Sequence, residues 1–281
     1  MSTIGTVSAA PAATRARPAY RVTGLRVLRS EWAKFWSLRS TWITLGISLL
    51  LLIALGLVGA GHYSPKLASQ QAGHHLISAG SNAVAIALAG MTLAQLATGV
   101  LGVLFAAGEY STGMIRSTLV AVPRRLPVLW SKAAVFGLVT LVLATAGAFV
   151  SFLAGEHFLA GQKIALTLSS AGVIRSLTGA GAYLALVAVM GVALGALLRS
   201  VAGGIAALIG GLLLLPVVAN LLPASWADAI SPYLPNNAGD AIFALTRDSN
   251  TLSPTAGLAV FVGWAALLLG LAAWRLVRTD A

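Results

Sequence analysis

The residue types that usually carry chemistry are scarce in this chain of 281 residues. Cysteine is absent, which excludes disulfides, thiolate metal sites and cysteine nucleophiles. His62, His74 and His75 lie in one polar segment, but that segment contains no carboxylate and adjacent histidines point in different directions on a helix. Glu156 and His157 do not form the H-E-x-x-H pattern of zinc peptidases. We therefore predict neither a metal site nor catalytic residues.

A phosphate-binding loop of the form G-x-x-x-x-G-K-[ST] is also missing, because no Gly-Lys pair occurs in the chain. We predict that the chain is not an ATPase and binds no cofactor itself. If it takes part in ATP-driven transport, ATP and Mg must be bound by a separate ATPase subunit.

A few polar residues interrupt the apolar runs of the sequence. Thr92, Gln95 and Thr98 recur at three-residue spacing and so share one face of a helix, and Asn220 lies near the end of a later run. Polar groups in hydrocarbon face either a cavity or another helix. These four residues are candidates for lining a pathway, with helix-to-helix hydrogen bonding as the alternative.

Composition then identifies the elements that must position these residues. Hydrophobic residues make up 58% of the chain and charged residues 9%, and the mean hydropathy is +0.90. Soluble domains have about a quarter of their residues charged. We therefore expect an all-α polytopic membrane protein with one transmembrane domain, 21–281, after a disordered cytoplasmic tail at 1–20 that is rich in Ala, Thr, Ser and Pro.

Six apolar runs are long enough to cross about 30 Å of hydrocarbon. We expect spans at 42–61, 83–107, 133–154, 177–198, 201–222 and 257–274. No ionisable residue lies at the centre of these runs, which argues against a carrier driven by an ion gradient. Gly191 and Gly195 form G-x-x-x-G, and Gly210 and Gly211 lie in the fifth run, but the sequence leaves open whether they pack within one bundle or between two protomers.

An amphipathic helix is predicted at 25–40, before the first span. One arc of this helix is apolar, and it holds Leu25, Leu28, Trp32, Phe35 and Trp36. Polar and charged residues lie elsewhere on it, namely Arg26, Arg29, Ser30, Glu31 and Lys34, with Arg39 at its end. We expect the helix to lie in the membrane interface, and a soluble helix packed on a core is the alternative.

The distribution of positive charge predicts the orientation of the chain. The net charge is +11, and 14 of the 18 Lys and Arg residues fall on the side of the N-terminus. By the positive-inside rule, both termini and the segment 108–132 are cytoplasmic in a multi-pass protein of the cell membrane. The basic residues follow this topology, so we predict a lipid bilayer as the partner and no nucleic acid.

The longest external segment, 223–254, is predicted to hold a short helix near 238–245.

The segment 108–132 is polar and lies between two spans. We expect a short surface helix that is capped by Ser111 or Thr112, passes through Met114, Ile115 and Leu119, and ends at Pro123.

Three motifs stand out between about residues 27 and 278. One consists of Glu109, Tyr110, Thr112, Gly113, Ile115, Arg116, Pro123, Arg124, Arg125 and Lys132. A second, before the first span, consists of Glu31, Trp32, Lys34, Ser37, Leu38, Arg39, Ser40, Thr41 and Trp42, and a third, before the last span, consists of Tyr233, Leu234, Pro235, Asn236, Asn237 and Ala238. In their order and spacing along the chain, these motifs resemble ABC-2 type permeases, the membrane subunits of a class of ATP-driven exporters.

The resemblance implies an efflux permease that acts as a homo- or heterodimer with two copies of an ABC ATPase subunit. It also implies that the segment 223–254 re-enters the outer leaflet and helps close the pathway. The residues expected to contact the ATPase or hold the cytoplasmic loop in register are Glu109, Gly113, Arg116, Pro123, Arg124, Arg125 and Lys132. As an alternative, Arg124, Arg125 and Lys132 anchor the chain to lipid headgroups. A secondary carrier and a membrane anchor or sensor subunit that transports nothing are the other functions that we keep open.

Overall fold

The computed structural model describes residues 23–63, 82–115, 118, 125–246 and 251–278. The regular secondary structure within these residues is helical throughout. Its elements are α1 (Gly24–Ser37), α2 (Arg39–Gly61), α4 (Ala83–Ala87), α5 (Met91–Ser111), α7 (Leu126–Leu159), α8 (Val173–Leu198), α9 (Val201–Ile209), the π-helical η2 (Gly210–Leu214), α10 (Leu215–Ala219), α11 (Ala224–Ile230), the 3-10 turn η3 (Ser231–Tyr233), α12 (Pro235–Phe243) and α13 (Pro254–Arg278). Six of these stretches are long and apolar enough to span a membrane, which confirms the predicted all-α polytopic fold. The predicted tail at 1–20 lies outside the described residues.

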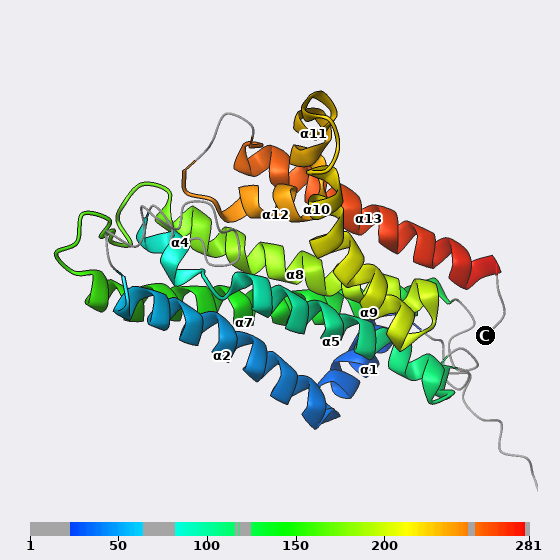
Figure 1. The fold of residues 1–281 in the computed structure, drawn as a ribbon. Coiled ribbons are helices and arrows are strands. Elements are labelled where there is room, and N and C mark those ends of the chain that lie inside the picture. The colour runs from blue at the N-terminus through cyan, green and yellow to red at the C-terminus, as the bar shows by residue number, and fades with distance from the viewer. Residues whose placement is uncertain (1–22, 64–81, 116–117, 119–124, 247–250, 279–281) are drawn as a thin grey trace, which may run out of the picture.

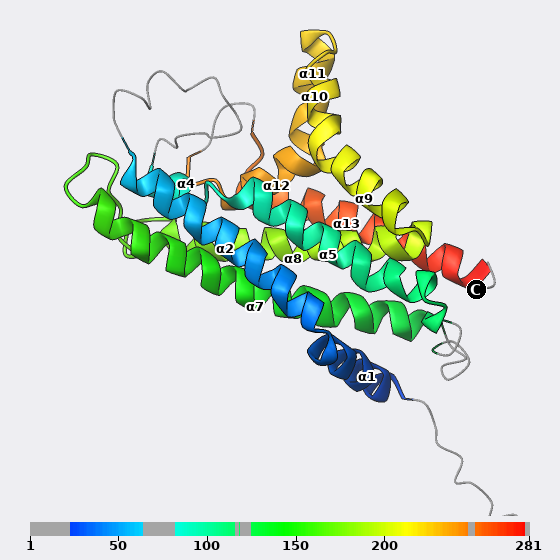
Figure 2. The same ribbon diagram turned by 60° about the horizontal axis from the view of Figure 1, so that its bottom comes forward.

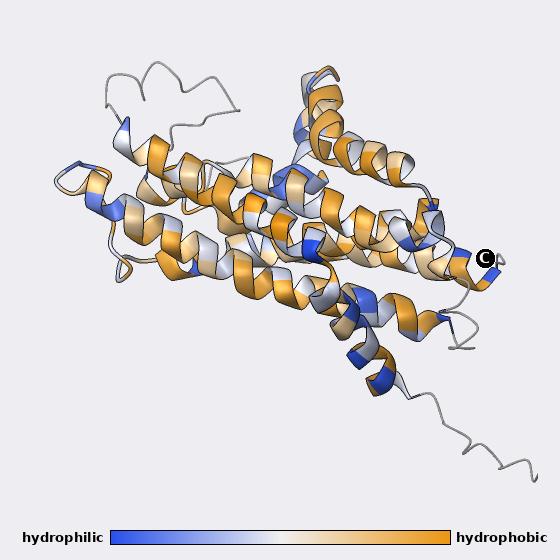
Figure 3. Cartoon of the chain, turned by 90° about the horizontal axis from the view of Figure 1, so that it is seen from below, coloured by the Kyte–Doolittle hydropathy of each residue, from blue (hydrophilic) through white to orange (hydrophobic). Residues whose placement is uncertain are grey.

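Helix α8 is the centre of the bundle, because α5, α7 and α13 all pack against it and α2 packs on α5 and α7 (Figures 1 and 2). We use two names for the ends of the bundle. The basic end holds α1, the C-terminal end of α5, the N-terminal end of α7, the Arg199–Ser200 turn and the C-terminal end of α13. The opposite end holds α4 and α12, and Figure 3 shows mostly apolar residues along the helices between the two ends.

Glycines let α5 and α8 approach each other closely. A Cβ atom on Gly191 would collide with the carbonyl oxygen of Gly99, and one on Gly195 would lie 2.7 Å from the carbonyl oxygen of Val103. The G-x-x-x-G pair therefore packs within this chain. In contrast, a Cβ atom on Gly210 or Gly211 would meet no atom within 4 Å.

The prediction of one continuous span at 83–107 is wrong. The helix is broken after α4, and α5 begins at Met91. Gly90 is pressed against the backbone of α2, where a Cβ atom would lie 2.6 Å from Cα of Leu52. Because the break frees carbonyl groups, the hydroxyl of Ser151 on α7 donates to the carbonyl of Ala87 at 2.7 Å. No proline marks this break, so sequence pattern alone did not reveal it.

The predicted segment 108–132 is shorter in the structure, because α5 continues to Ser111 and α7 begins at Leu126. The hydroxyls of Ser111 and Thr112, predicted as a cap for a new helix, bond back to α5. Both donate to the carbonyl of Gly108, at 3.0 and 2.9 Å, so they close the end of α5. Gly113 follows with φ +72°, the left-handed conformation that commonly ends a helix. Met114 and Ile115 are helical again, and the predicted helix end at Pro123 lies outside the described residues.

The fifth span differs from the others in shape and burial. It runs from Val201 to Ala219 through α9, η2 and α10, and 17% of its most apolar window is buried, against 72% for α8. The π-helical turn comes just before Pro216, which lacks an N–H group and would otherwise clash with the preceding turn. This span leans away from the bundle (Figure 2).

Candidate functional site

Four charged side chains from three helices form one cluster at the basic end. Lys34 on α1 binds Glu31 of the same helix and Glu109 on α5, with N–O distances of 2.8 and 3.1 Å. Lys132 on α7 binds the same two carboxylates at 2.8 and 2.9 Å. We call Glu31, Lys34, Glu109 and Lys132 the ion cluster. Each lysine bridges both glutamates, so the cluster joins α1, α5 and α7.

A layer of phenylalanines lies directly beside the ion cluster. Each helix places a phenylalanine four residues from its charged residue: Phe35 from Glu31, Phe105 from Glu109 and Phe136 from Lys132. The three ring centroids lie 5.5–6.0 Å apart. A spacing of four residues puts two side chains on the same face of a helix. Each helix therefore presents one charge and one ring to the same junction.

The ion cluster is buried. The exposed fractions of the Glu31, Glu109 and Lys132 side chains are 1%, 6% and 5%, while Lys34 is 28% exposed. Burial by itself lowers the pKa of Lys34, but its bonds to Glu31 and the charges of Glu31 and Glu109 outweigh it, and the net shift is upward. The Nζ atom of Lys132 also lies 4.2 Å from the centroid of the Phe105 ring.

One atom of the ion cluster remains unsatisfied. Both lysines bind Oε1 of Glu109, whereas Oε2 is buried without a hydrogen-bond partner among the described residues. A buried carboxylate oxygen without a partner is unfavourable. This observation marks Glu109 as the member of the cluster that would gain most from a further donor.

The face of helix α1 that packs on the bundle is not the predicted apolar arc. Its buried residues are Val27, Glu31 and Phe35. Trp32 and Trp36 are 41% and 55% exposed, and of the five residues in the predicted apolar arc only Phe35 is buried. Helix α1 packs on α7 through Phe35, whereas the other four residues of the arc are left exposed by the described residues.

Other basic residues at this end bind backbone carbonyls of neighbouring helices. Arg125 donates to the carbonyl of Leu276 at 3.2 Å, and Arg275 donates to that of Leu197. Arg199, in the left-handed conformation with φ 54°, lies over the ring of Tyr110 at 5.3 Å. Arg275 and Arg199 were not among the predicted site residues. Their positions just after apolar runs were the available signal, since cations there can bind the last carbonyls of a helix.

Two other predicted residues of this end, Arg39 and Gly113, are not part of the ion cluster. Arg39 is exposed at the start of α2, and Gly113 forms the turn after α5. Arg116, Pro123 and Arg124 lie outside the described residues.

The predicted pathway residues occupy three different environments. Thr98 is buried and shares a hydrogen bond of 2.8 Å with Ser48 on α2, and Gln95 accepts a hydrogen bond from Tyr183 on α8. Thr92 is half-buried, and Asn220 is exposed at the end of α10. Gln95 and Thr98 thus link helices in this structure.

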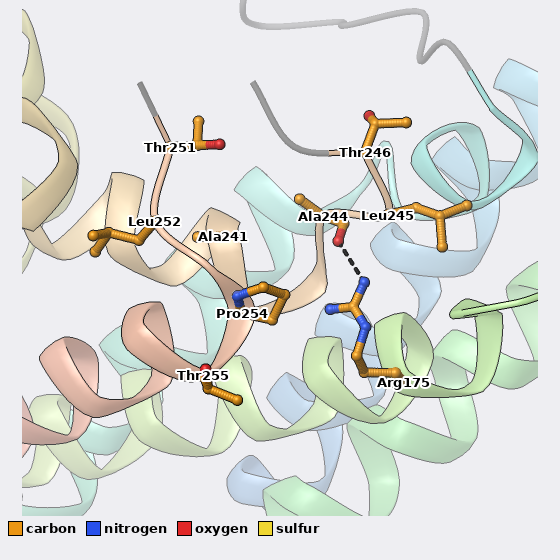
Figure 4. Close-up of a pocket in the computed structure, with 9 residues that line it drawn as sticks. All are labelled: Arg175, Ala241, Ala244, Leu245, Thr246, Thr251, Leu252, Pro254 and Thr255. Carbon is orange, nitrogen blue, oxygen red and sulfur yellow. Dashed lines mark hydrogen bonds between the residues drawn. The ribbon is translucent and has the colours of Figure 1, made fainter. Parts of the chain in front are cut away.

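At the opposite end, α12 is wedged between α8 and α13. A Cβ atom on Gly179 would lie 2.7 Å from the carbonyl oxygen of Ile242, and one on Gly257 would lie 2.6 Å from that of Ala238. Arg175 donates to the carbonyl groups of Ile242 and Ala244 at 3.2 and 2.8 Å, beside an open cavity of about 410 Å³ (Figure 4). A cation at the C-terminal end of a helix satisfies carbonyls that lack helical partners. The guanidinium of Arg175 is therefore occupied in holding α12. The helix predicted near 238–245 is present, shifted towards the N-terminus.

Among the described residues, no three His, Asp or Glu side chains are placed to hold a metal ion together. His74 and His75 lie outside the described residues. Comparison with known proteins finds no family model that matches this chain and no curated protein similar to it.

Proposed function

We propose that this chain is the permease subunit of an ATP-binding-cassette exporter, which forms the substrate pathway and is driven by a separate ATPase. The single observation that carries the proposal is the ion cluster. It ties the interfacial helix α1 to α5 and α7, the two helices that flank the segment 112–125. In the proposed orientation this segment faces the cytoplasm, where a soluble ATPase can push on it. Movement of the segment then reaches α1, α5 and α7 as one unit.

The first experiment is co-purification in mild detergent with an ATP-binding-cassette ATPase encoded beside this chain, followed by ATPase assays of the complex in lipid vesicles. We expect a stable complex whose ATP turnover depends on this chain. Glu109→Gln keeps the size of the side chain but removes the negative charge that both lysines bind, and we expect it to weaken the dependence. Glu156→Gln, at the opposite end, is the matched control. Failure of every such ATPase to associate would contradict the proposal.

A secondary carrier is the second candidate, and one observation favours it. Asp240 on α12 lies beside α8 rather than in a surface loop, although the six predicted spans carry no ionisable residue at their centres. Carriers driven by ion gradients generally need such a group. Transport into vesicles that contain this chain without any ATPase would favour the carrier over the pump.

A further inference from the structure

The least buried residues of α12 are Asn236, Asn237, Asp240 and Phe243. Pro235, Ala238, Gly239, Ala241 and Ile242 are buried between α8 and α13. Asp240 is exposed and Asn236 is half-buried, and the Nδ2 atom of Asn236 donates to Oδ2 of Asp240 at 3.1 Å. These two residues are four apart and share one face of the helix. Phe243, three residues beyond Asp240 and so its neighbour along the helix, is half-buried, and its ring lies 5.4 Å from the ring of Tyr183 between centroids.

The packing of α12 places this face alongside the membrane-spanning part of the bundle. A Cβ atom on Gly239 would collide with the ring of Tyr183. Tyr183 is ten residues from Val173, where α8 begins at the opposite end. At 1.5 Å per residue, Gly239 is therefore about 15 Å along α8 from that end. A carboxylate at such a position is expensive if it faces lipid, so it is expected to face a water-filled space or a ligand.

Within the described residues, no lysine or arginine forms an ion pair with Asp240. Asn236 is the hydrogen-bond partner of its carboxylate among the described residues. The two glutamates of the ion cluster, by contrast, are each bound to two lysines. Helix α12 also lies against η2, where Leu214 is 59% exposed, and Leu215 on α10 is 41% exposed.

We propose that Asp240, Asn236 and Phe243 form a recognition site for the positively charged group of an amphiphilic organic cation, with the aliphatic side chains of η2 and α10 receiving its apolar part. The carboxylate supplies the opposite charge, and the aromatic ring adds a favourable contact with a cation. The proposal names the substrate class of the proposed transport function and so rests on it.

The test is equilibrium binding to the purified full-length chain in detergent, without any ATPase, using tetraphenylphosphonium as the cationic probe and N-phenylnaphthylamine as a neutral one. Asp240→Asn preserves the shape of the side chain and removes its charge. We expect it to weaken tetraphenylphosphonium binding by at least about ten-fold, in line with the loss of a charge-assisted contact. Binding of the neutral probe should stay unchanged.

Two further variants make the test specific. Asp228→Asn removes an equivalent exposed carboxylate from α11 and should leave both affinities unchanged. Asp240→Glu keeps the charge and should retain most of the cation affinity. The proposal is overturned if wild-type protein shows no preference for the cation, if Asp240→Asn binds it as well as wild type, or if Asp228→Asn weakens it equally. Proton uptake that depends on Asp240 without any effect on cation affinity would also overturn it.

Because binding is measured without the ATPase, its outcome is separate from that of the proposed function. If Asp240→Asn loses cation binding and no ATPase associates with the chain, the recognition site is supported and the proposed ATP-driven pump is rejected.

Discussion

Each charge in the ion cluster depends on the others. Replacing both members of a buried ion pair with apolar groups is often tolerated, but removing one member leaves an unpaired buried charge. Lys132 is the extreme case, because both Glu31 and Glu109 bind it and all three side chains are at most 6% exposed. Its replacement leaves two buried carboxylates with Lys34 as their shared cation.

We expect Lys132→Met to lower the free energy of unfolding by about 3–5 kcal/mol, as found when one partner of a buried pair is removed. Denaturant-induced unfolding in detergent, followed by tryptophan fluorescence, measures this. Lys163→Met is the matched control, since Lys163 is exposed at the opposite end. Equal stability of the two variants would show that the cluster contributes little.

The upward shift in the pKa of Lys34 gives a pH dependence with a defined sign. The folded state holds this proton more tightly than the unfolded state, whose value is 10.5. The stabilisation by Lys34 is therefore fully present below pH 10.5 and is lost as the pH rises through the higher folded value. We expect the difference in melting temperature between wild type and Lys34→Met to stay constant between about pH 7 and pH 9 and to shrink at higher pH. A difference that shrinks already between those two values contradicts the assignment.

At the scale of the helices, sequence analysis predicted most of the fold because apolar length is the dominant signal for a spanning helix. Six candidate spans are present, the second at Met91–Ser111 instead of 83–107, and the turn at Arg199–Ser200 separates the fourth from the fifth as expected. The break before Met91 was missed because it depends on contact between Gly90 and α2, and such a contact has no local signature.

Sequence analysis also named all four members of the ion cluster but assigned them to two separate sets. Glu109 and Lys132 were placed in a polar loop because charged residues are usually excluded from spans. The structure extends α5 and α7 around them, and each charge is neutralised by a partner on another helix. The repeated spacing of a charged residue and a phenylalanine four residues apart was the signal available in the sequence. This spacing indicates a shared cluster only when the three helices are known to contact one another.

The close approach of α5 and α8 gives a prediction at the same scale. We expect Gly191→Ala to destabilise the protein by about 1–3 kcal/mol, because its Cβ would meet the rigid backbone of Gly99. Gly211→Ala provides the control, since its Cβ would meet open space and alanine favours the helix by about 0.5–1 kcal/mol. Thermal unfolding of both variants in the same detergent separates the effects. A Gly191→Ala protein as stable as wild type would show that the two helices can move apart freely.

At the scale of the whole molecule, the fifth span is the least buried, and Val217 on α10 is 58% exposed. If the proposed exporter is a homodimer, this span is a suitable surface for the second protomer. Because the chain has no cysteine, any disulfide between two protomers must form at the one position where a cysteine is introduced.

We expect Val217→Cys to form a disulfide-linked dimer in native membranes under mild oxidation. Leu138→Cys, at an exposed position of α7, should remain monomeric. Gel electrophoresis without reductant measures both. A monomeric Val217→Cys protein would argue for a different partner on this face.

The ion cluster also constrains how the chain is made. Glu31 and Lys132 are separated by 101 positions, and Glu109 enters the growing chain between them. While the ribosome is still synthesising α5, Lys34 is the sole cation of the cluster available to the two glutamates. The arrival of Lys132 completes the charge balance, so α1, α2 and α5 settle into their final arrangement only after α7 has been inserted. A chain that stops between residues 111 and 126 therefore holds both glutamates of the ion cluster but only one of its two lysines, and the junction of α1, α5 and α7 is incomplete.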